Sequence, residues 1–475
     1  MRILGLVGIV FLLAISPAAC NKMKSVREAS ARADKISAGA PPIDKKADPG
    51  EFSKSVPMME PSTGTDRGPD RMEKSKGDGK SDERKAAFDK TPDPKSTPAV
   101  AEAMVATAKK SRLPKDSPQS GILTAGSFDD NLEPRFFHAF LNRLQQNQNM
   151  GDFLGKLQGQ RLLLIVKDEA GKPVGNARVK LTANGAGTEL ITRSDGRAVF
   201  VLPFDGFTGS GNLSVTVTPP AGTGSVQQTI PSGIARWEVT LPSVRATLPR
   251  YLDLAIVLDT TGSMGDELKY LQSELRGITA AIQKRFLEVE QRFALILYRD
   301  DGDEYVTRPF DFTPSIDTFH RNLSKQSAAG GGDYPEAMHR GLEEANQLRW
   351  REQDSARVLF LIADAPPHAQ HMTRTMTAAN ALRKRGVAIY PVACSGYDDA
   401  CEVIMRACAM LTGGQFLFLT DDSGVGNAHG EPHIPFYQVQ RLEQLMVRMI
   451  AGELSGRRIE PQASEIIRTV GKKVN

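Results

Sequence analysis

Long apolar runs alternate with segments of helical spacing over the C-terminal half of the chain. The apolar runs cover residues 252–259, 292–300, 305–312, 356–364, 386–393 and 414–421. Most of these runs are continuous, which is typical of strands that are buried on both faces of a parallel sheet. Because helical patterns separate them, we predict an α/β fold with a doubly wound, mostly parallel sheet over residues 251–455.

The region that precedes it in the sequence consists of shorter runs with the pattern of β-strands. Residues 159–246 contain β-rich runs such as "RAVFVLP" and "NLSVTVTP", separated by turn signals such as "SDGR" and "DGFTGSG". About seven strands at this spacing predict a small β-sandwich. The stretch from "GKPVGNARVKL" to "TRSDGRAVF" resembles the carboxypeptidase-regulatory-like and transthyretin-like sandwiches of cell-surface proteins. No cluster of catalytic or ligating residues lies in it, so we expect a spacer or a support.

Residues 21–119 are rich in Lys, Asp, Glu, Ser, Pro and Gly, and their only aromatic residues are Phe52 and Phe88. Such a composition cannot bury enough apolar surface to offset the entropy of ordering the chain. We therefore expect a disordered tether with a root-mean-square reach of about 50–60 Å. Residues 120–158 are predicted to form a helical lead-in that docks on the folded region C-terminal to it, and residues 456–475 a C-terminal tail.

The first twenty residues predict a targeting segment. Arg2 precedes the apolar stretch "ILGLVGIVFLLAI", which is short for a membrane span, and the small residues "PAA" precede Cys20. This pattern resembles the lipobox of bacterial lipoproteins, in which the Cys is acylated, although Pro17 stands where Leu is usual. By the same resemblance, Asn21 favours anchoring at the outer membrane or cell surface of a bacterial envelope. The alternative is an ordinary secretory signal in which Cys20 is incidental.

Overall composition excludes some classes of function. The net charge of +4 is small for 475 residues and argues against nucleic acid as the main partner. The chain contains no HExxH, GxSxG or GxxxxGK[ST] motif, so we do not expect an enzyme.

Three predicted loops at one edge of the sheet carry oxygen ligands. Asp259, Thr261 and Ser263 follow the first apolar strand; Asp333 and Glu336 follow a glycine run in "AAGGGDYPEA"; Asp364 ends the strand "VLFLIAD". In open α/β sheets, ligands bind outside the carboxyl ends of the strands, so these loops are expected to converge. Carboxylates and hydroxyls without His or Cys suit a hard divalent cation such as Mg²⁺, Ca²⁺ or Mn²⁺.

The D-x-T-x-S run, the GGGD-x-PE loop and the later strand-ending Asp resemble the metal-ion-dependent adhesion site (MIDAS) of von Willebrand factor type A domains. The resemblance covers about 200 residues and implies that Asp259, Thr261, Ser263 and Asp364 hold a cation, with Mg²⁺ expected first. It also implies that a partner protein completes the coordination with an acidic side chain. Where the family commonly uses a Thr in the second loop, this chain has none. Its "D-x-P-E" run resembles the integrin β-subunit version, which implies Glu336 as the ligand and Asp333 as a direct, water-mediated or adjacent-site ligand.

Other polar runs are given less weight. The run "RDDGDEY", Arg299 to Tyr305, lacks the spacing of an EF-hand loop, so we expect a charged hairpin turn. The pair His368 and His371 lacks a completing ligand. The run holding His429, Glu431 and His433 is expected to be a structured loop, and the Cys394 turn lacks the leading Gly of a nucleophile elbow.

Three cysteines remain besides Cys20, namely Cys394, Cys401 and Cys408. Cys401 and Cys408 are seven residues apart on one predicted helix, roughly 10 Å along its axis, which is too far for a disulfide. A bridge from Cys394 to one of them is plausible in an oxidising compartment. Three reduced core cysteines are the alternative, and the sequence does not separate the two.

Together these features predict an envelope-anchored binding protein that recognises a partner protein through a divalent cation, for adhesion or assembly. A structural or assembly component in which the metal only stabilises the fold is the alternative, and a hydrolase is a further one.

Overall fold

The computed structural model describes residues 118–145, 152–220, 222–332 and 334–472. Cys20, the targeting segment, nearly all of the predicted tether and Asp333 therefore lie outside the described residues. None of the described helices is long and apolar enough to cross a membrane.

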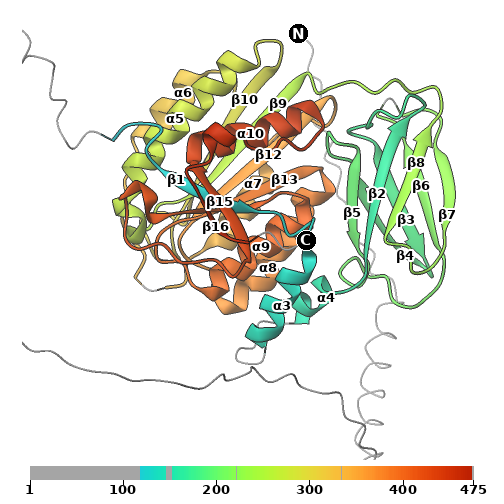
Figure 1. The fold of residues 1–475 in the computed structure, drawn as a ribbon, viewed down its shortest axis with the longest axis horizontal. Helices are drawn as coiled ribbons and strands as arrows, with labels where there is room; N and C mark the ends of the chain where they lie inside the picture. The colour runs from blue at the N-terminus through green and yellow to red at the C-terminus, as the bar shows by residue number, and fades with distance from the viewer. Residues whose placement is uncertain (1–117, 146–151, 221, 333, 473–475) are drawn as a thin grey trace, which may run out of the picture. The chain divides into compact units, whose positions relative to one another are not determined.

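A nine-stranded sheet forms the framework of the C-terminal region (Figure 1). Its order is β11 (Thr307–Thr313), β10 (Glu290–Tyr298), β9 (Tyr251–Asp259), β12 (Ser355–Ala363), β13 (Val387–Ala393), β14 (Phe416–Leu419), β1 (Thr124–Phe128), β15 (Phe436–Arg441) and β16 (Arg468–Gly471). Strands β10, β9, β12, β13 and β14 pair in parallel, whereas β11, β1 and β16 pair antiparallel to their neighbours. The prediction of an α/β fold with a mostly parallel sheet is confirmed.

Two layers of helices cover the sheet. One buried cluster packs the sheet against α5 (Leu268–Arg285), α6 (Ile316–Ser324) and α10 (Leu442–Ser455). A second cluster packs it against α3 (Pro134–Gln145), α4 (Asp152–Leu157), α7 (Met338–Gln347), α8 (Met372–Lys384) and α9 (Asp399–Thr412). Burial on both faces explains why the central strands are continuously apolar.

The chain leaves β9 in one direction and returns on its other side. The connection through α5 leads to β10, and later crossovers build β12, β13 and β14 on the opposite flank of β9. The strand order therefore reverses between β9 and β12, and the crevice at such a switch point is where open α/β sheets bind ligands. Asp259 ends β9 and Asp364 directly follows β12, so both lie at this switch point.

Residues 120–158 differ from the predicted lead-in, because they contain a strand as well as helices. Strand β1 inserts between β14 and β15, and it pairs antiparallel with both (Figure 1). Helices α3 and α4 follow, and their apolar side chains join the core beside α9. Arg406 of α9, which is fully buried, donates to both carboxylate oxygens of Asp130 just after β1, at 2.9 and 2.7 Å.

In the part of the chain between α4 and β9, seven strands form a sandwich. One sheet has the order β5 (Arg197–Val201), β2 (Arg161–Asp168), β8 (Arg236–Leu241). The other has the order β4 (Ala186–Ile191), β3 (Arg178–Ala183), β6 (Leu213–Thr218), β7 (Val226–Ile230). Alternate residues of each strand face a shared apolar core, as expected of a two-layer sandwich.

Cys394, Cys401 and Cys408 are free and buried. Cys401 and Cys408 both lie on α9, near its start and in its second half. The structure therefore has the three reduced core cysteines, and the disulfide from Cys394 that we considered is not formed.

Candidate metal site

The first loop of the candidate site begins where β9 ends. Asp259 is fully buried, and its Oδ1 accepts hydrogen bonds from the backbone N–H of Thr261 at 2.9 Å and from the Thr261 hydroxyl at 2.7 Å. The Thr261 and Ser263 hydroxyls lie 3.2 Å apart. A short 3₁₀ helix, Gly262–Asp266, then turns the chain toward α5. The loop therefore gathers three oxygen-bearing side chains, with Thr261 buried and Ser263 exposed.

The glycine run of the second loop lies directly against the first. The backbone N–H of Gly262 donates to the Gly330 carbonyl at 3.0 Å. Gly331 has φ +66°, and a Cβ placed there would lie 2.5 Å from Oε1 of Glu336 and 3.0 Å from Cβ of Thr261. Only a glycine fits this close approach without strain. The missing side chain is what allows the Glu336 carboxylate and Thr261 to come together.

Glu336 is fixed by the third loop. Its backbone N–H donates to the Pro366 carbonyl at 3.0 Å, and Glu336 forms an isolated parallel bridge with Pro367. Asp364 directly follows β12 and is 3% exposed, close to the 4% of Glu336. The predicted convergence of the three loops is what the structure shows for Asp259, Thr261, Ser263, Glu336 and Asp364.

Each of the three carboxylates has one buried oxygen without a hydrogen-bond partner. These atoms are Oδ2 of Asp259, Oε2 of Glu336 and Oδ1 of Asp364. Buried carboxylate oxygens are costly to leave unpartnered, so a cation, protons or water must satisfy them.

The pKa values of these carboxyls reflect the same cost of burying a negative charge. Burial raises the pKa of Asp259 to about 6. Burial, with the neighbouring charge of Asp259, raises the pKa of Asp364 to about 7. Burial, together with the charges of Asp259 and three further aspartates, raises the pKa of Glu336 to about 9. Each carboxyl therefore holds its proton to a higher pH than it would in water.

Two of those further aspartates come from the run that we predicted to be a charged hairpin turn. The turn is present, because residues 299–306 join the antiparallel pair β10 and β11. Asp303 accepts from the backbone N–H of Gly331 at 2.8 Å, and Asp300 is 5% exposed. The charges of both raise the pKa of Glu336. Neither aspartate was predicted to belong to the site, although β10 neighbours β9 and its carboxyl end lies at the same edge.

The donor set fits a hard divalent cation. It consists of carboxylate and hydroxyl oxygens only, without a nitrogen or sulfur ligand. Among groups of three or more His, Cys, Asp or Glu in the described residues, only Asp399, Glu402 and His433 have ligand atoms that all lie within 4.8 Å of one another. The carboxylates of Asp259, Glu336 and Asp364 are therefore spaced more widely.

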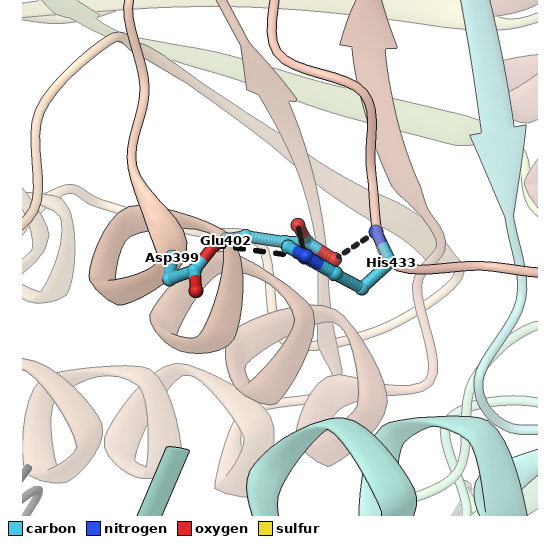
Figure 2. A group of neighbouring side chains, drawn as sticks. All are labelled: Asp399, Glu402 and His433. Carbon is cyan, nitrogen blue, oxygen red and sulfur yellow. Dashed lines mark hydrogen bonds and ion pairs between the residues drawn. The ribbon is translucent and has the colours of Figure 1, made fainter. Parts of the chain in front are cut away.

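The more compact group, drawn in Figure 2, is an ion-pair network. Glu402 accepts from Arg406 Nη1 and from the backbone N–H of His433, both at 2.9 Å, and its other oxygen lies 2.9 Å from His433 Nδ1. The guanidinium of Arg406 supplies the positive charge that Glu402 needs. A metal ion at this place would lie beside a fixed cation, so the group does not offer a metal site.

The other histidines singled out in the sequence each contact a different group. His368 Nε2 lies 2.8 Å from Oδ1 of Asp300, and the ring of His371 stacks on His339 with centroids 4.1 Å apart. His429 lies between Glu267 and Asp421 at 2.8 Å from each, whereas Glu431 accepts from the Tyr437 hydroxyl at 2.9 Å. Residues 421–436 therefore form a structured loop.

Comparison with curated proteins gives partial matches. The chain is 31% identical over 186 residues to an ariadne-like RING finger protein of Acanthamoeba polyphaga mimivirus, covering 35% of this chain and 18% of that protein. It is 33% identical over 134 residues to the alpha-protein kinase vwkA of Dictyostelium discoideum, covering 28% and 21%. It is 30% identical over 132 residues to von Willebrand factor A domain-containing protein 7 of Homo sapiens, covering 28% and 14%. The chain thus spans about a fifth or less of the length of these relatives.

Solved structures match over part of the chain at low overall similarity. The hypothetical protein BatB from Bacteroides thetaiotaomicron has 10% sequence identity and a TM-score of 0.31, covering 43% of this chain and 99% of that one. Proximal thread matrix protein 1 from the mussel byssus, described with zinc in its MIDAS motif, has 18% identity and a TM-score of 0.27, covering 34% and 40%.

The family model described as "von Willebrand factor A domain" matches residues 253–398. This range begins inside β9 and contains Asp259, Thr261, Ser263, Glu336 and Asp364. Residues 253–398 of this chain are therefore a von Willebrand factor A domain with a D-x-T-x-S metal-site motif.

Proposed function

We propose that this protein binds a divalent cation at the carboxyl ends of β9 and β12 and uses it to bind an acidic side chain of a partner protein. The observation that carries the proposal is the set of unpartnered buried oxygens on Asp259, Glu336 and Asp364. Thr261 and Ser263 would hold the cation together with these carboxylates. The bound cation would supply a positive centre that a carboxylate from outside can coordinate.

The burial of the ligands favours approach from one side. Asp259 and Thr261 are fully buried, whereas Ser263 and its neighbour Gly262 are exposed. The Thr261 hydroxyl donates its proton to Asp259, which keeps its oxygen lone pairs available for a cation. A partner would therefore reach the cation past Ser263, while the carboxylates lie beneath it.

Tyr334 supplies an aromatic surface beside this opening. It is 45% exposed, one of few large apolar side chains in the described residues that are so exposed. Its hydroxyl accepts from the backbone N–H of Asp398 at 3.0 Å and donates to the Asp364 carbonyl at 3.4 Å. A tethered, exposed aromatic ring is well suited to a protein interface. We propose that Tyr334 contacts the partner next to the coordinated carboxylate.

Recognition rather than turnover is the role we propose. We also propose that acylation of Cys20 anchors the chain to a bacterial envelope, with residues 21–119 as a tether and the sandwich as a support. This part rests on the sequence pattern, and metabolic labelling with a palmitate analogue in wild type and Cys20→Ala would test it.

A structural role for the cation is the second candidate. Three carboxylates carry more negative charge than one dication neutralises, and this would weaken attraction for a further carboxylate. In that case the cation would stabilise the edge of the sheet, and partner binding would not require it.

Partner capture from envelope extract distinguishes the two candidates. We would compare wild type, Asp259→Asn and the matched control Glu288→Gln, each with Mg²⁺ and with chelator. Glu288 is exposed in the turn before β10, away from the loops of the site. Asn has nearly the shape of Asp and removes its negative charge, so the fold should persist; circular dichroism and thermal melting would verify this.

We expect specific capture by wild type and by Glu288→Gln in Mg²⁺, and loss of the captured protein with chelator or with Asp259→Asn. Capture of the same protein by chelated wild type and by folded Asp259→Asn would favour the structural role and overturn the proposed one.

A further inference from the structure

A second feature of the molecule is a cavity of about 380 Å³ lined by arginines. Its wall includes Arg161 at the start of β2 and Arg193 in the turn after β4, together with Arg383 of α8 and Arg448 of α10. Small-molecule sites typically have volumes of roughly 300–1,000 Å³. The cavity reaches the surface, because its lining includes Leu132, which is 56% exposed.

The lining carries an excess of positive charge. Seven arginines line the cavity, against three carboxylates. Several of the arginines are paired: Arg193 with Glu453, Arg197 with Asp195, and Arg458 with Asp129 and Glu460. Arg383 binds both oxygens of Asp205 at 2.8 Å. Asp205 and Glu460 lie outside the lining, so they offset part of the excess but not all of it.

Arg161 and Arg448 hydrogen-bond to neutral oxygens. Arg161 Nη2 donates to the side-chain oxygen of Asn131. Arg448, which is 7% exposed, donates to the side chain of Gln440 at 2.7 Å and to the Ile459 carbonyl at 3.2 Å. A guanidinium that is partly or fully shielded from water normally has an anionic partner. These two arginines therefore have unused capacity for an anion.

Unpartnered donors gather at this cavity. Within the described residues, four arginines have a buried Nε without a hydrogen-bond partner: Arg161, Arg193, Arg383 and Arg448. All four line this cavity. The guanidinium groups around this cavity therefore have hydrogen-bonding capacity that the described residues do not use.

The pKa of Arg161 agrees with this charge distribution. Burial lowers it, and the positive charge of Arg383 lowers it further, while Asp129 and Asp130 raise it without restoring its usual value. The acidic residues near the cavity thus do not compensate Arg161. A bound anion would.

Apolar side chains form much of the remaining wall. They include Leu163, Leu190, Ile191 and Met449, with the aromatic ring of Tyr390. An inorganic ion would leave this surface in contact with water, whereas an organic anion would cover it. We propose that the cavity binds a small organic anion whose carboxylate or phosphate group is held by the arginines and whose apolar part packs on these side chains.

Calorimetric titration of the full chain with defined probes would test this. Phenyl phosphate and benzoate present the two acidic groups on one apolar ring, inorganic phosphate lacks the ring, and benzyl alcohol lacks the charge. We expect phenyl phosphate or benzoate to bind more tightly than both inorganic phosphate and benzyl alcohol. Comparison of the two ring-bearing probes would identify the acidic group. Absence of saturable binding of either to the folded chain would overturn the proposal.

Three variants locate the binding. Arg161→Gln and Arg448→Gln should each weaken binding by about tenfold or more, since a charge-assisted hydrogen bond is lost. Arg178→Gln is the matched control, because Arg178 is an exposed arginine of the sandwich that pairs with Glu189 and does not line the cavity. Arg161 is only partly buried, so its variant should fold even if Arg448→Gln does not, and thermal melting would verify folding.

Equal affinity in Arg161→Gln and in the control would mean that the probe binds elsewhere, and this would overturn the proposal. The proposal is independent of the metal site: Asp259→Asn should bind the anion as wild type does, so failure of one proposal is distinguishable from failure of the other.

Discussion

Two groups of buried acids in this molecule differ in how their charge is compensated. Asp130 and Glu402 have side chains 1% exposed, and fully buried Arg406 lies between them with hydrogen bonds of 2.7 to 2.9 Å to both. Asp259, Glu336 and Asp364 are similarly buried, yet each has an oxygen without a partner. We call the first group complete, because a buried cation of the chain pairs with both acids, and the second incomplete, because no cationic side chain of the described residues pairs with its carboxylates.

The comparison teaches that burial of acids alone does not identify a binding site. The Asp399, Glu402 and His433 group has the closer ligand-atom spacing, but Arg406 already neutralises it. The strand-end acids are more widely spaced and lack such a cation. Unsatisfied oxygens, rather than the tightest cluster, therefore indicate where an ion binds.

Breaking the complete group should have the largest effect. Arg406→Met would leave Asp130 and Glu402 buried without their cation, and this should lower the free energy of unfolding by about 3–5 kcal/mol. Denaturant unfolding would measure the loss, with the exposed Arg178→Met as control. A loss below about 1 kcal/mol would mean that the Arg406 network contributes no more than a surface pair.

Removing one charge from the incomplete group should instead raise the free energy of unfolding. Asp364→Asn removes a charge that burial disfavours, so in chelator at pH 8 it should raise the free energy of unfolding, on the order of 2 kcal/mol. It should also weaken cation binding. Destabilisation of the cation-free protein by Asp364→Asn would show that the Asp364 charge is already compensated.

The pH dependence of the incomplete group follows from its raised pKa values. Asp259, Asp364 and Glu336 have pKa values of about 6, 7 and 9, above their ordinary values of 3.8, 3.8 and 4.5. Between the ordinary and the raised values, the folded chain binds more protons than the unfolded chain. Stability of the cation-free protein contributed by these groups should therefore fall as pH rises from about 5 to 9.

Cation affinity should change in the reverse direction, since the cation competes with protons for the same oxygens. Titration with Mn²⁺ at several pH values should show affinity that rises from pH 6 to pH 8, by up to about tenfold per pH unit for each proton released. In Asp364→Asn this slope should be shallower. A pH-independent affinity in wild type would be inconsistent with protonated ligands.

The smallest expected effect is at Gly331. Gly331→Ala places a Cβ 2.5 Å from Oε1 of Glu336 at a residue with φ +66°, so it should cost about 1–2 kcal/mol of stability and reduce cation affinity by moving Glu336. Gly302→Ala is the control, since Gly302 also has positive φ but a Cβ there would have no atom within 4 Å. Equal cation affinity in both variants would show that Glu336 does not contact the ion.

Much of this framework could be predicted from the sequence because local pattern determines it. Continuous apolar runs identified β9 and β12, and the rule for parallel sheets placed Asp259 and Asp364 at one edge. Local pattern alone does not determine the position of Glu336, because it depends on Gly331 and on hydrogen bonding to Pro366, which lies on a different loop.

Features that depend on distant contacts were missed. Strand β1 is only five residues long, and its partners β14 and β15 lie roughly three hundred residues later in the chain. Asp300 and Asp303 follow a strand whose neighbour in the sheet is β9, but their charged run is also typical of an ordinary hairpin turn. The arginines around the cavity come from strands, helices and turns far apart in the chain, such as β2, α8 and α10, and no sequence spacing relates them.

The central claim is that oxygens of three loops form one divalent-cation site. Isothermal titration of the chelator-treated full chain with Mn²⁺ at neutral pH tests it most directly, with wild type, Asp259→Asn and Glu288→Gln compared. The account predicts one saturable site in wild type and Glu288→Gln that is lost or greatly weakened in folded Asp259→Asn. Equal binding in all three, or no binding to wild type, would contradict it.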